Sequence, residues 1–456
     1  MTDRRDDVPQ AGATTMNRGR TGGEGDVPSA AQDRVGVVLA GAGARGAYEA
    51  GVLSVLAPAL ARSGAAPKIV VGTSAGAINA SAYAALAHLD PDEAAGKLLD
   101  LWRSVGRANV FRSLFRSGPT TLANYLAEVA GLPKARLTGL LDTAPLWATA
   151  RQRVDWGQIH ANVRSEHVAA VAVVATSAYA GRTVVFVERG AGVDLPGPDD
   201  ARALDYHDAQ INAEHVLASS AIPVAFPAVR VHQPREAAGW YVDGGVRLNA
   251  PLKPALSLRV DSVVVVATHP AVYESPVQSG PERHRQPQIA DAGVQILDAA
   301  LADRMVEDVR TLGKINELVA GGGARGSGRA YHQVPYLFVG PVDRGDLGDL
   351  ARDVYRRRPG WMQALRSPDF ALLYRLIGAD EPRVGDLLSY LFFDPEFMEA
   401  AIDLGREHAQ QVLGGSGRGG TAVPWQIAAP RGPAVPPPRR AAERSPAAGA
   451  RRRASR

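Results

Sequence analysis

Residues 72–76 have the sequence Gly-Thr-Ser-Ala-Gly and place a serine, Ser74, where a nucleophile could act. The pattern Gly-x-Ser-x-Gly is typical of a sharp turn between a strand and a helix, whose crowded backbone leaves room only for small neighbours such as Gly72 and Gly76. The N–H groups and the dipole at the start of the following helix would stabilise negative charge beside the serine. Taken alone the pattern is weak, since a serine in this place could also be an ordinary helix N-cap.

A second glycine-rich segment, residues 41–46, has the sequence Gly-Ala-Gly-Ala-Arg-Gly and follows an apolar run. As Gly-x-Gly-x-x-Gly between a strand and a helix, it could bind the pyrophosphate of a dinucleotide. That interpretation needs an acidic residue at the end of the next strand, and this strand leads into residues 72–74 instead. The alternative is an oxyanion loop, whose backbone N–H groups face a tetrahedral intermediate formed at the serine. The candidate oxyanion residues are Gly41, Ala42, Gly43, Ala44 and Arg45.

The third segment, residues 241–245, reads Tyr-Val-Asp-Gly-Gly and places the carboxylate of Asp243 at the expected end of a strand. Asp-Gly-Gly on its own is typical of a turn. A serine hydroxyl is a weak nucleophile at neutral pH and needs a partner that accepts its proton. With a candidate nucleophile elsewhere in the chain, Asp243 becomes the candidate general base.

Together, the three segments resemble those of the patatin-like phospholipase family in their order and approximate spacing. The similarity covers about residues 35–270 and includes residues 174–176, 181–186, 218–227 and 249–251. The family pattern in the glycine-rich loop is Gly-Gly-Gly-x-Arg/Lys-Gly, and this chain has Ala42 at the middle glycine. A methyl group there would restrict the approach of the backbone slightly without removing the N–H donor.

The resemblance implies a serine acyl hydrolase that cleaves carboxylic esters of lipids through a Ser-Asp dyad and an acyl-enzyme. Ser74 would be the nucleophile, and Asp243 would accept its proton directly and later activate water. Arg45 would either anchor the oxyanion loop or meet a lipid phosphate, and we expect anchoring. We expect no metal and no organic cofactor. Phospholipid is the first expected substrate, followed by lysophospholipid, acylglycerol and simple esters.

None of the ten histidines lies in a recognisable motif of a Ser-His-Asp triad, so we expect them to be structural or at the surface. His215, close to residues 218–227, is the one to test. Residues 321–326, Gly-Gly-Gly-Ala-Arg-Gly, match the family loop better than residues 41–46 do, but they follow an expected helix, which favours a flexible loop. The aromatic cluster at residues 390–393, Tyr-Leu-Phe-Phe, could cover an acyl groove or dip into lipid, although core packing is the expectation.

The elements that position these residues follow from hydrophobic periodicity. Two strand-turn-helix units, at residues 35–60 and 68–86, predict a parallel sheet covered by helices. We expect further strands at residues 168–176, 183–187 and 262–268, and further helices at residues 92–104, 118–131, 208–219, 289–319, 347–356 and 395–413. The expected fold class is α/β, with a three-layer α/β/α patatin-like core and a mainly parallel sheet, plus a mostly helical C-terminal lobe.

The chain has 456 residues, of which 46% are hydrophobic, enough for one large core and a smaller lobe. We expect four parts: a disordered N-terminal tail at residues 1–33, a catalytic domain at 34–284, a mostly helical lobe at 285–413 and a disordered Arg/Pro-rich tail at 414–456. Nine arginines and one glutamate follow residue 413 and give this tail a charge of about +8. Since the whole chain has a net charge of +4, the rest of the chain has a charge of about −4. This distribution disfavours a nucleic-acid partner for the globular part.

The chain has no cysteine, which excludes a disulfide framework, a thiolate nucleophile and a cysteine metal site. No run approaches the roughly 18 apolar residues of a membrane-spanning helix, and the start lacks the apolar region of a secretory signal. We therefore expect a cytoplasmic protein, with peripheral membrane contact left open. A non-catalytic membrane scaffold with the same fold is the alternative, and the intact Ser74 and Asp243 speak against it. The head group, acyl length, positional selectivity, oligomeric state and physiological role are open in the sequence.

Overall fold

The computed structural model describes residues 34–112, 139, 141–223, 225–271, 303–321, 332–343, 345–357, 382–414 and 423–429. The expected tail at residues 1–33, the helix at 118–131, the glycine-rich loop at 322–326 and most of the C-terminal tail lie outside the described residues.

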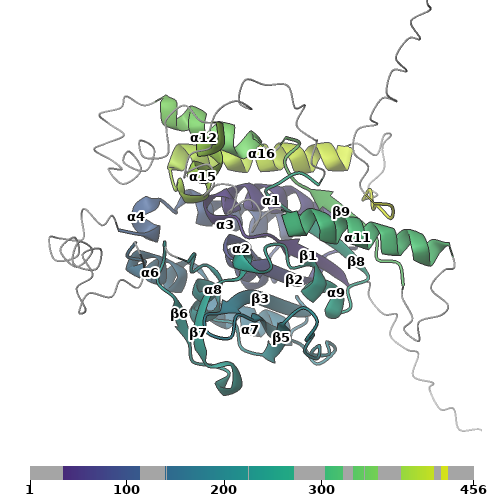
Figure 1. Ribbon diagram of the computed structural model, residues 1–456. Coiled ribbons are helices and arrows are strands. Elements are labelled where there is room, and N and C mark those ends of the chain that lie inside the picture. Colours follow the sequence, from purple (N-terminus) through teal and green to yellow (C-terminus); the bar gives the residue numbers. More distant parts are fainter. Residues whose placement is uncertain are drawn as a thin grey trace, which may run out of the picture. The chain divides into compact units, whose positions relative to one another are not determined.

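A mostly parallel sheet of nine strands forms the centre of the described chain (Figure 1). Its main order is β5-β4-β3-β2-β1-β8-β9, and β7 pairs with β3 and β6 beside this path. The strands are β1 (Val35–Leu39), β2 (Pro67–Thr73), β3 (Ala170–Ser177), β4 (Thr183–Arg189), β5 (Leu204–Asp208), β6 (Val229–Val231), β7 (Gly239–Asp243), β8 (Ser262–Val266) and β9 (Tyr336–Val339). The five strands from β3 to β9 along the path run parallel, whereas β4 and β7 are antiparallel to β3.

Both faces of the sheet are buried, as the alternation along β1 shows. Val37 and Leu39 belong to one hydrophobic cluster, and Val38 with the following Ala40 belongs to another. Because side chains alternate across a strand, a continuous apolar run is what a sheet covered on both faces requires. The predicted three-layer α/β/α class is confirmed.

Helices cover the sheet on both sides (Figure 1). The first cluster joins one face to α1 (Gly46–Arg62), α3 (Pro91–Arg103), α12 (Asp346–Arg356), α15 (Pro382–Leu391) and α16 (Pro395–Gly414). The second cluster joins the other face to α9 (Leu252–Ser257) and α11 (Asp303–Ala320). The remaining helices are α2 (Ala75–Leu86), α4 (Arg107–Val110), α6 (Ala144–Arg153), α7 (Trp156–Arg164) and α8 (Ala213–Ser219), with short 3₁₀ turns η1 (Gly43–Arg45), η3 (Arg235–Ala237) and η4 (Gly244–Val246).

The predicted helix at residues 208–219 is wrong in its first part. Leu204–Asp208 form the strand β5, which pairs in parallel with β4, and the helix begins only at Ala213. The side chain of Asn212 accepts a hydrogen bond from the N–H of Glu214, which is the usual start of a helix. The short strand was missed because only Leu204 and Tyr206 alternate there with polar residues.

The elements after residue 285 share the sheet and its helical layer. β9 lies parallel to β8 in the same sheet, and α16 packs along α1. The two helices approach closely, since a Cβ at Gly51 would lie 2.2 Å from the carbonyl oxygen of Ile402 and one at Gly405 would lie 2.2 Å from that of Tyr48. The division of the chain at residue 284 stays a prediction.

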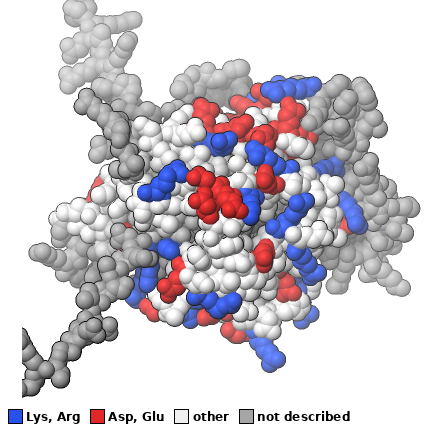
Figure 2. Space-filling model, turned by 180° about the vertical axis from the view of Figure 1, so that it is seen from behind, with Lys and Arg blue, Asp and Glu red and all other residues white. Residues whose placement is uncertain are grey.

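Charges on the face opposite to the view of Figure 1 are mixed. Figure 2 shows basic and acidic side chains interspersed there, without one broad basic area. Among the described residues, no helix combines the length and the apolar character that crossing a membrane requires.

Candidate active site

Ser74 lies in a strained turn between β2 and α2. Its backbone has φ 54° and ψ −123°, a region that costs a non-glycine residue about 1–3 kcal/mol and that marks functional sites. The neighbouring glycines leave no room for a side chain: a Cβ at Gly72 would lie 2.2 Å from the carbonyl oxygen of Gly76, and one at Gly76 would lie 2.4 Å from that of Leu39. The turn therefore requires the two glycines that the motif supplies.

Asp243 meets Ser74 where the carboxyl ends of β2 and β7, which both pair with β3, approach each other. β7 runs antiparallel to β3 with Asp243 opposite Ala175, and β3 lies next to β2. The Oγ of Ser74 donates a hydrogen bond of 2.6 Å to Oδ2 of Asp243. The other carboxylate oxygen accepts a bond of 2.7 Å from the N–H of Gly245. The structure thus brings together the two residues that the sequence pointed to.

Burial raises the pKa of Asp243 to about 6. The hydrogen bonds from Ser74 and from the N–H of Gly245 stabilise the ionised form, but they do not offset the loss of water around the carboxylate. At neutral pH the group is ionised, and its pKa close to neutrality suits a general base.

Ser219 holds the backbone of the turn and was missed as a site residue. Its Oγ accepts a bond of 2.8 Å from the N–H of Ser74 and donates one of 2.5 Å to the carbonyl oxygen of Val174. The side chain is fully buried. Its signal in the sequence was only its place among the small residues of 218–227, which did not indicate a bridge between a helix and two strands.

The glycine-rich loop lies directly beside Ser74. A Cβ at Gly41 would lie 3.3 Å from the Cβ of Ser74. Two of the five candidate N–H groups already have acceptors: that of Gly41 donates to the carbonyl oxygen of Asn249, and that of Arg45 donates to that of Ala42. Within the described part of the chain, the N–H groups of Ala42, Gly43 and Ala44 have no acceptor.

Arg45 points away from Ser74 and is fixed by α15. Its fully buried guanidinium donates to Oγ of Ser389 at 2.7 Å and to Oδ1 of Asp386 at 3.1 Å. It also lies 4.2 Å from the ring centroid of Tyr390. Gly43 completes this contact, since its φ is +55° and a Cβ there would lie 2.3 Å from the carbonyl oxygen of Tyr390. The burial and these partners favour anchoring of the loop over contact with a lipid phosphate.

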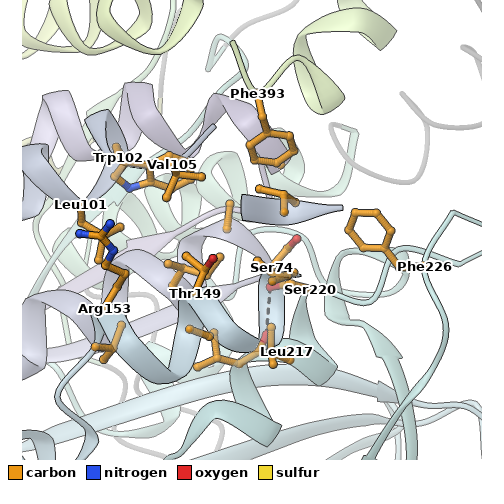
Figure 3. A pocket seen from close by; sticks show the side chains of 18 of the residues that line it. Ser74, Leu101, Trp102, Val105, Thr149, Arg153, Leu217, Ser220, Phe226 and Phe393 are labelled. Atoms are coloured by element: carbon orange, nitrogen blue, oxygen red, sulfur yellow. Dashed lines mark hydrogen bonds between the residues drawn. The ribbon is translucent and has the colours of Figure 1, made fainter. Parts of the chain in front are cut away.

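An apolar cavity of about 70 Å³ opens beside Ser74 (Figure 3). Side chains of α2, α3, α6 and α8 line it, among them Ile78, Trp102, Thr149 and Leu217. Phe393, one of the aromatic residues 390–393, also lines it, whereas Phe392 packs in the core against Phe397. The cluster therefore serves both the core and the cavity wall.

A buried polar network supports the wall of this cavity. The Nε1–H of Trp102 donates to Oδ1 of Asn79 at 2.6 Å, and Nδ2 of Asn79 donates to Oε2 of Glu49 at 3.0 Å. Burial holds the pKa of Glu49 well above its usual range, which favours the neutral form of this carboxyl group. The network ties α1, α2 and α3 together behind the loop.

The structure places His215 in a structural role. Its Nδ1 accepts a bond from the N–H of Asn212, and its Nε2 lies 2.8 Å from the carbonyl oxygen of Gln233. Burial lowers the pKa of this imidazole, which favours the neutral form. None of the described histidines lines the cavity beside Ser74. The described residues also contain no group of three or more His, Asp or Glu side chains that could hold a metal ion.

Comparisons with known proteins bear on this geometry. Residues 37–256 match a family model described as patatin-like phospholipase. Among solved structures, the chain is similar to VipD from Legionella pneumophila, with 14% identity, a TM-score of 0.31 and coverage of 83% of this chain and 68% of that one. It is also similar to human GIVD cytosolic phospholipase A2, solved in complex with methyl gamma-linolenyl fluorophosphonate, with 15% identity, a TM-score of 0.34 and coverage of 83% and 57%. No curated protein matches the chain.

Proposed function

Residues 37–256 of this chain form a patatin-like phospholipase domain, and from this premise we propose that the protein is a serine hydrolase of lipid esters that acts through Ser74 and Asp243. The family match supports lipid acyl hydrolase activity. The observation that carries the proposal is the 2.6 Å hydrogen bond from Ser74 to Asp243 beside an apolar cavity. A strained serine, a carboxylate of raised pKa and a space for an acyl chain meet at this point.

In the proposed acylation step, Asp243 accepts the hydroxyl proton while Oγ of Ser74 attacks the ester carbonyl carbon. The resulting oxyanion faces the N–H groups of Ala42, Gly43 and Ala44, with that of Ala75 at the start of α2 as a further donor. The intermediate then collapses, and the leaving alcohol takes the proton from Asp243. In deacylation, Asp243 takes a proton from water, the hydroxide equivalent attacks the acyl carbon, and Ser74 is released with its proton restored.

The substrate follows from the cavity and the family. The almost entirely apolar lining suits the hydrocarbon chain of a lipid acyl group. Phospholipid is the leading substrate in the proposal, and the protein would meet it by peripheral contact with a lipid surface. A cytoplasmic location stays a prediction.

The test is fatty acid release from phosphatidylcholine in mixed micelles, with acyl chains of eight and of sixteen carbons, measured by mass spectrometry. Wild type and a matched control at the exposed end of α1, Ser63→Ala, are expected to release fatty acid, and Ser74→Ala is expected to release none. Circular dichroism checks that each variant is folded. Release by Ser74→Ala, or no release by folded wild type, would overturn the proposal, and the second result would favour a non-catalytic scaffold.

A further inference from the structure

Two cavities meet behind Ser74. The first is the apolar cavity described above, and the second, of about 420 Å³, adjoins it. Leu101, Arg153 and Val154 line both of them. These three residues therefore form the boundary between the two cavities.

The helix α2 runs past both cavities in sequence order. Its first residues line the first cavity and its last residues line the second: Ser74, Ala75 and Ile78, then Ala82, Ala85 and Leu86. With a rise of about 1.5 Å per residue, the boundary lies roughly 6 to 12 Å from Ser74 along the helix.

The helix α3 also lines both cavities, but its C-terminal end lies at the first cavity and its earlier residues lie at the second. Val105 and Trp102, near its C-terminal end, line the first cavity, and Asp100 and Lys97, further back, line the second. Two helices thus place the cavities one behind the other on a path that starts at Ser74.

The chemical character of the path changes at Arg153. The first cavity is almost entirely apolar, whereas His88, Lys97, Asp100 and Asp155 contribute to the second. Figure 3 shows Arg153 and Leu101 at the end of the first cavity away from Ser74, with the guanidinium directed towards Leu101. Within the described part of the chain, no carboxylate or carbonyl pairs with this guanidinium, so water must solvate it.

We propose that Arg153 closes the first cavity against longer acyl chains, so that the protein prefers medium-length acyl esters. This inference rests on the proposed lipid hydrolase function and names its substrate class. A chain that passed Arg153 would displace the water of an unpaired cation with methylene groups, which is unfavourable.

The size of the space sets the expected length. An extended chain advances about 1.3 Å per carbon, so a path of roughly 6 to 12 Å holds about five to nine carbons. The cavity of about 70 Å³ is also small beside the roughly 300 Å³ or more of a typical ligand pocket. We therefore expect the best substrates to carry acyl chains of about eight carbons.

The experiment compares kcat/KM for p-nitrophenyl esters with acyl chains from four to sixteen carbons, in wild type, Arg153→Ala, Arg153→Lys and Arg151→Ala. Arg151 is the matched control, because it lies on the same helix and stacks on Trp147 at 5.2 Å without lining either cavity. All four proteins are first checked for equal thermal melting, which is expected because both arginines are exposed.

Wild type, Arg153→Lys and Arg151→Ala are expected to peak near eight carbons and to decline beyond. Arg153→Ala joins the two cavities, and each methylene that it lets the protein bury is worth about fourfold. Burial of only two of the six additional methylenes should therefore raise the ratio of the fourteen-carbon to the eight-carbon ester at least about tenfold. A wild type that hydrolyses both esters equally, or an active Arg153→Ala with an unchanged ratio, would overturn the inference and leave the proposed function standing. No hydrolysis of any ester would overturn the proposed function, and the inference with it.

Discussion

Ser74 and Asp243 lie on strand ends whose supports belong to the same part of the chain, whereas the loop at residues 41–46 depends on a helix far along the sequence. Ser219 and Gly245, which hold the backbone of the turn and the carboxylate, lie within the stretch that matches the family model. Arg45, by contrast, is held by Ser389, 344 residues further on and outside that stretch. A local motif thus identifies the proposed nucleophile and base, while the groups that position the site can come from elsewhere in the chain.

The largest expected effect is that of a change in the dyad of Ser74 and Asp243. Asp243→Asn should lower kcat by about a thousandfold or more, because an amide cannot accept the proton of Ser74. Steady-state kinetics on the best ester measures this loss.

The same variant tests the effect of the carboxylate on stability. The pKa of Asp243 is higher in the folded protein, about 6, than in the unfolded chain, near 4, so ionisation of this group lowers the free energy of unfolding as the pH rises through this range. We therefore expect Asp243→Asn to melt no lower than wild type at pH 7.5, and a large drop in melting temperature would contradict this account of the carboxylate.

A smaller effect is expected for the residues of α15 that hold the loop at residues 41–46. Asp386→Asn and Ser389→Ala should each lower kcat about 10- to 100-fold with KM little changed, since the loop that faces the transition state loses its anchor while the acyl cavity stays intact. The control is Asp353→Asn, an exposed position on α12. If kcat is unchanged, or if only KM rises, the anchoring role of α15 is refuted.

The pH profile distinguishes the two sides further. Asp243 must be ionised to act as base, so kcat/KM should fall about tenfold per pH unit below about 6 and level off above it. Asp386→Asn should lower the whole curve without moving this limb. If the midpoint of this acidic limb lies near pH 4, or if it shifts in Asp386→Asn, a group other than buried Asp243 sets the pH dependence of kcat/KM.

The smallest expected effect is at the residue that departs from the family pattern. Ala42 is 1% exposed, has φ −143° and packs in the hydrophobic core, so its methyl group is accommodated without strain. Ala42→Gly should change kcat less than about threefold and lower stability by about 1 kcal/mol, as measured by urea unfolding. A gain in kcat above tenfold would mean that the methyl group holds the loop away from its active position.

The predictable part of the molecule was that in which local pattern and tertiary structure agree. The apolar runs before residues 41–46 and 72–76 predicted β1 and β2, and the motifs predicted which residues the strand ends bring together. The bridge of Ser219 and the partners of Arg45 on α15 were not predicted, because both depend on residues distant in sequence. The strands β5, β6 and β9 were not predicted because they are short, with five, three and four residues. A buried arginine in particular has no local signature, since only its partners make its burial possible.

The most direct test of the central claim is reaction of the full chain with a fluorophosphonate, followed by peptide mapping of the modified residue. We predict a single adduct on Ser74, faster labelling in wild type than in Asp243→Asn, and no labelling of Ser74→Ala. An adduct on another serine, or no adduct on folded wild type at pH 7.5, would contradict the account.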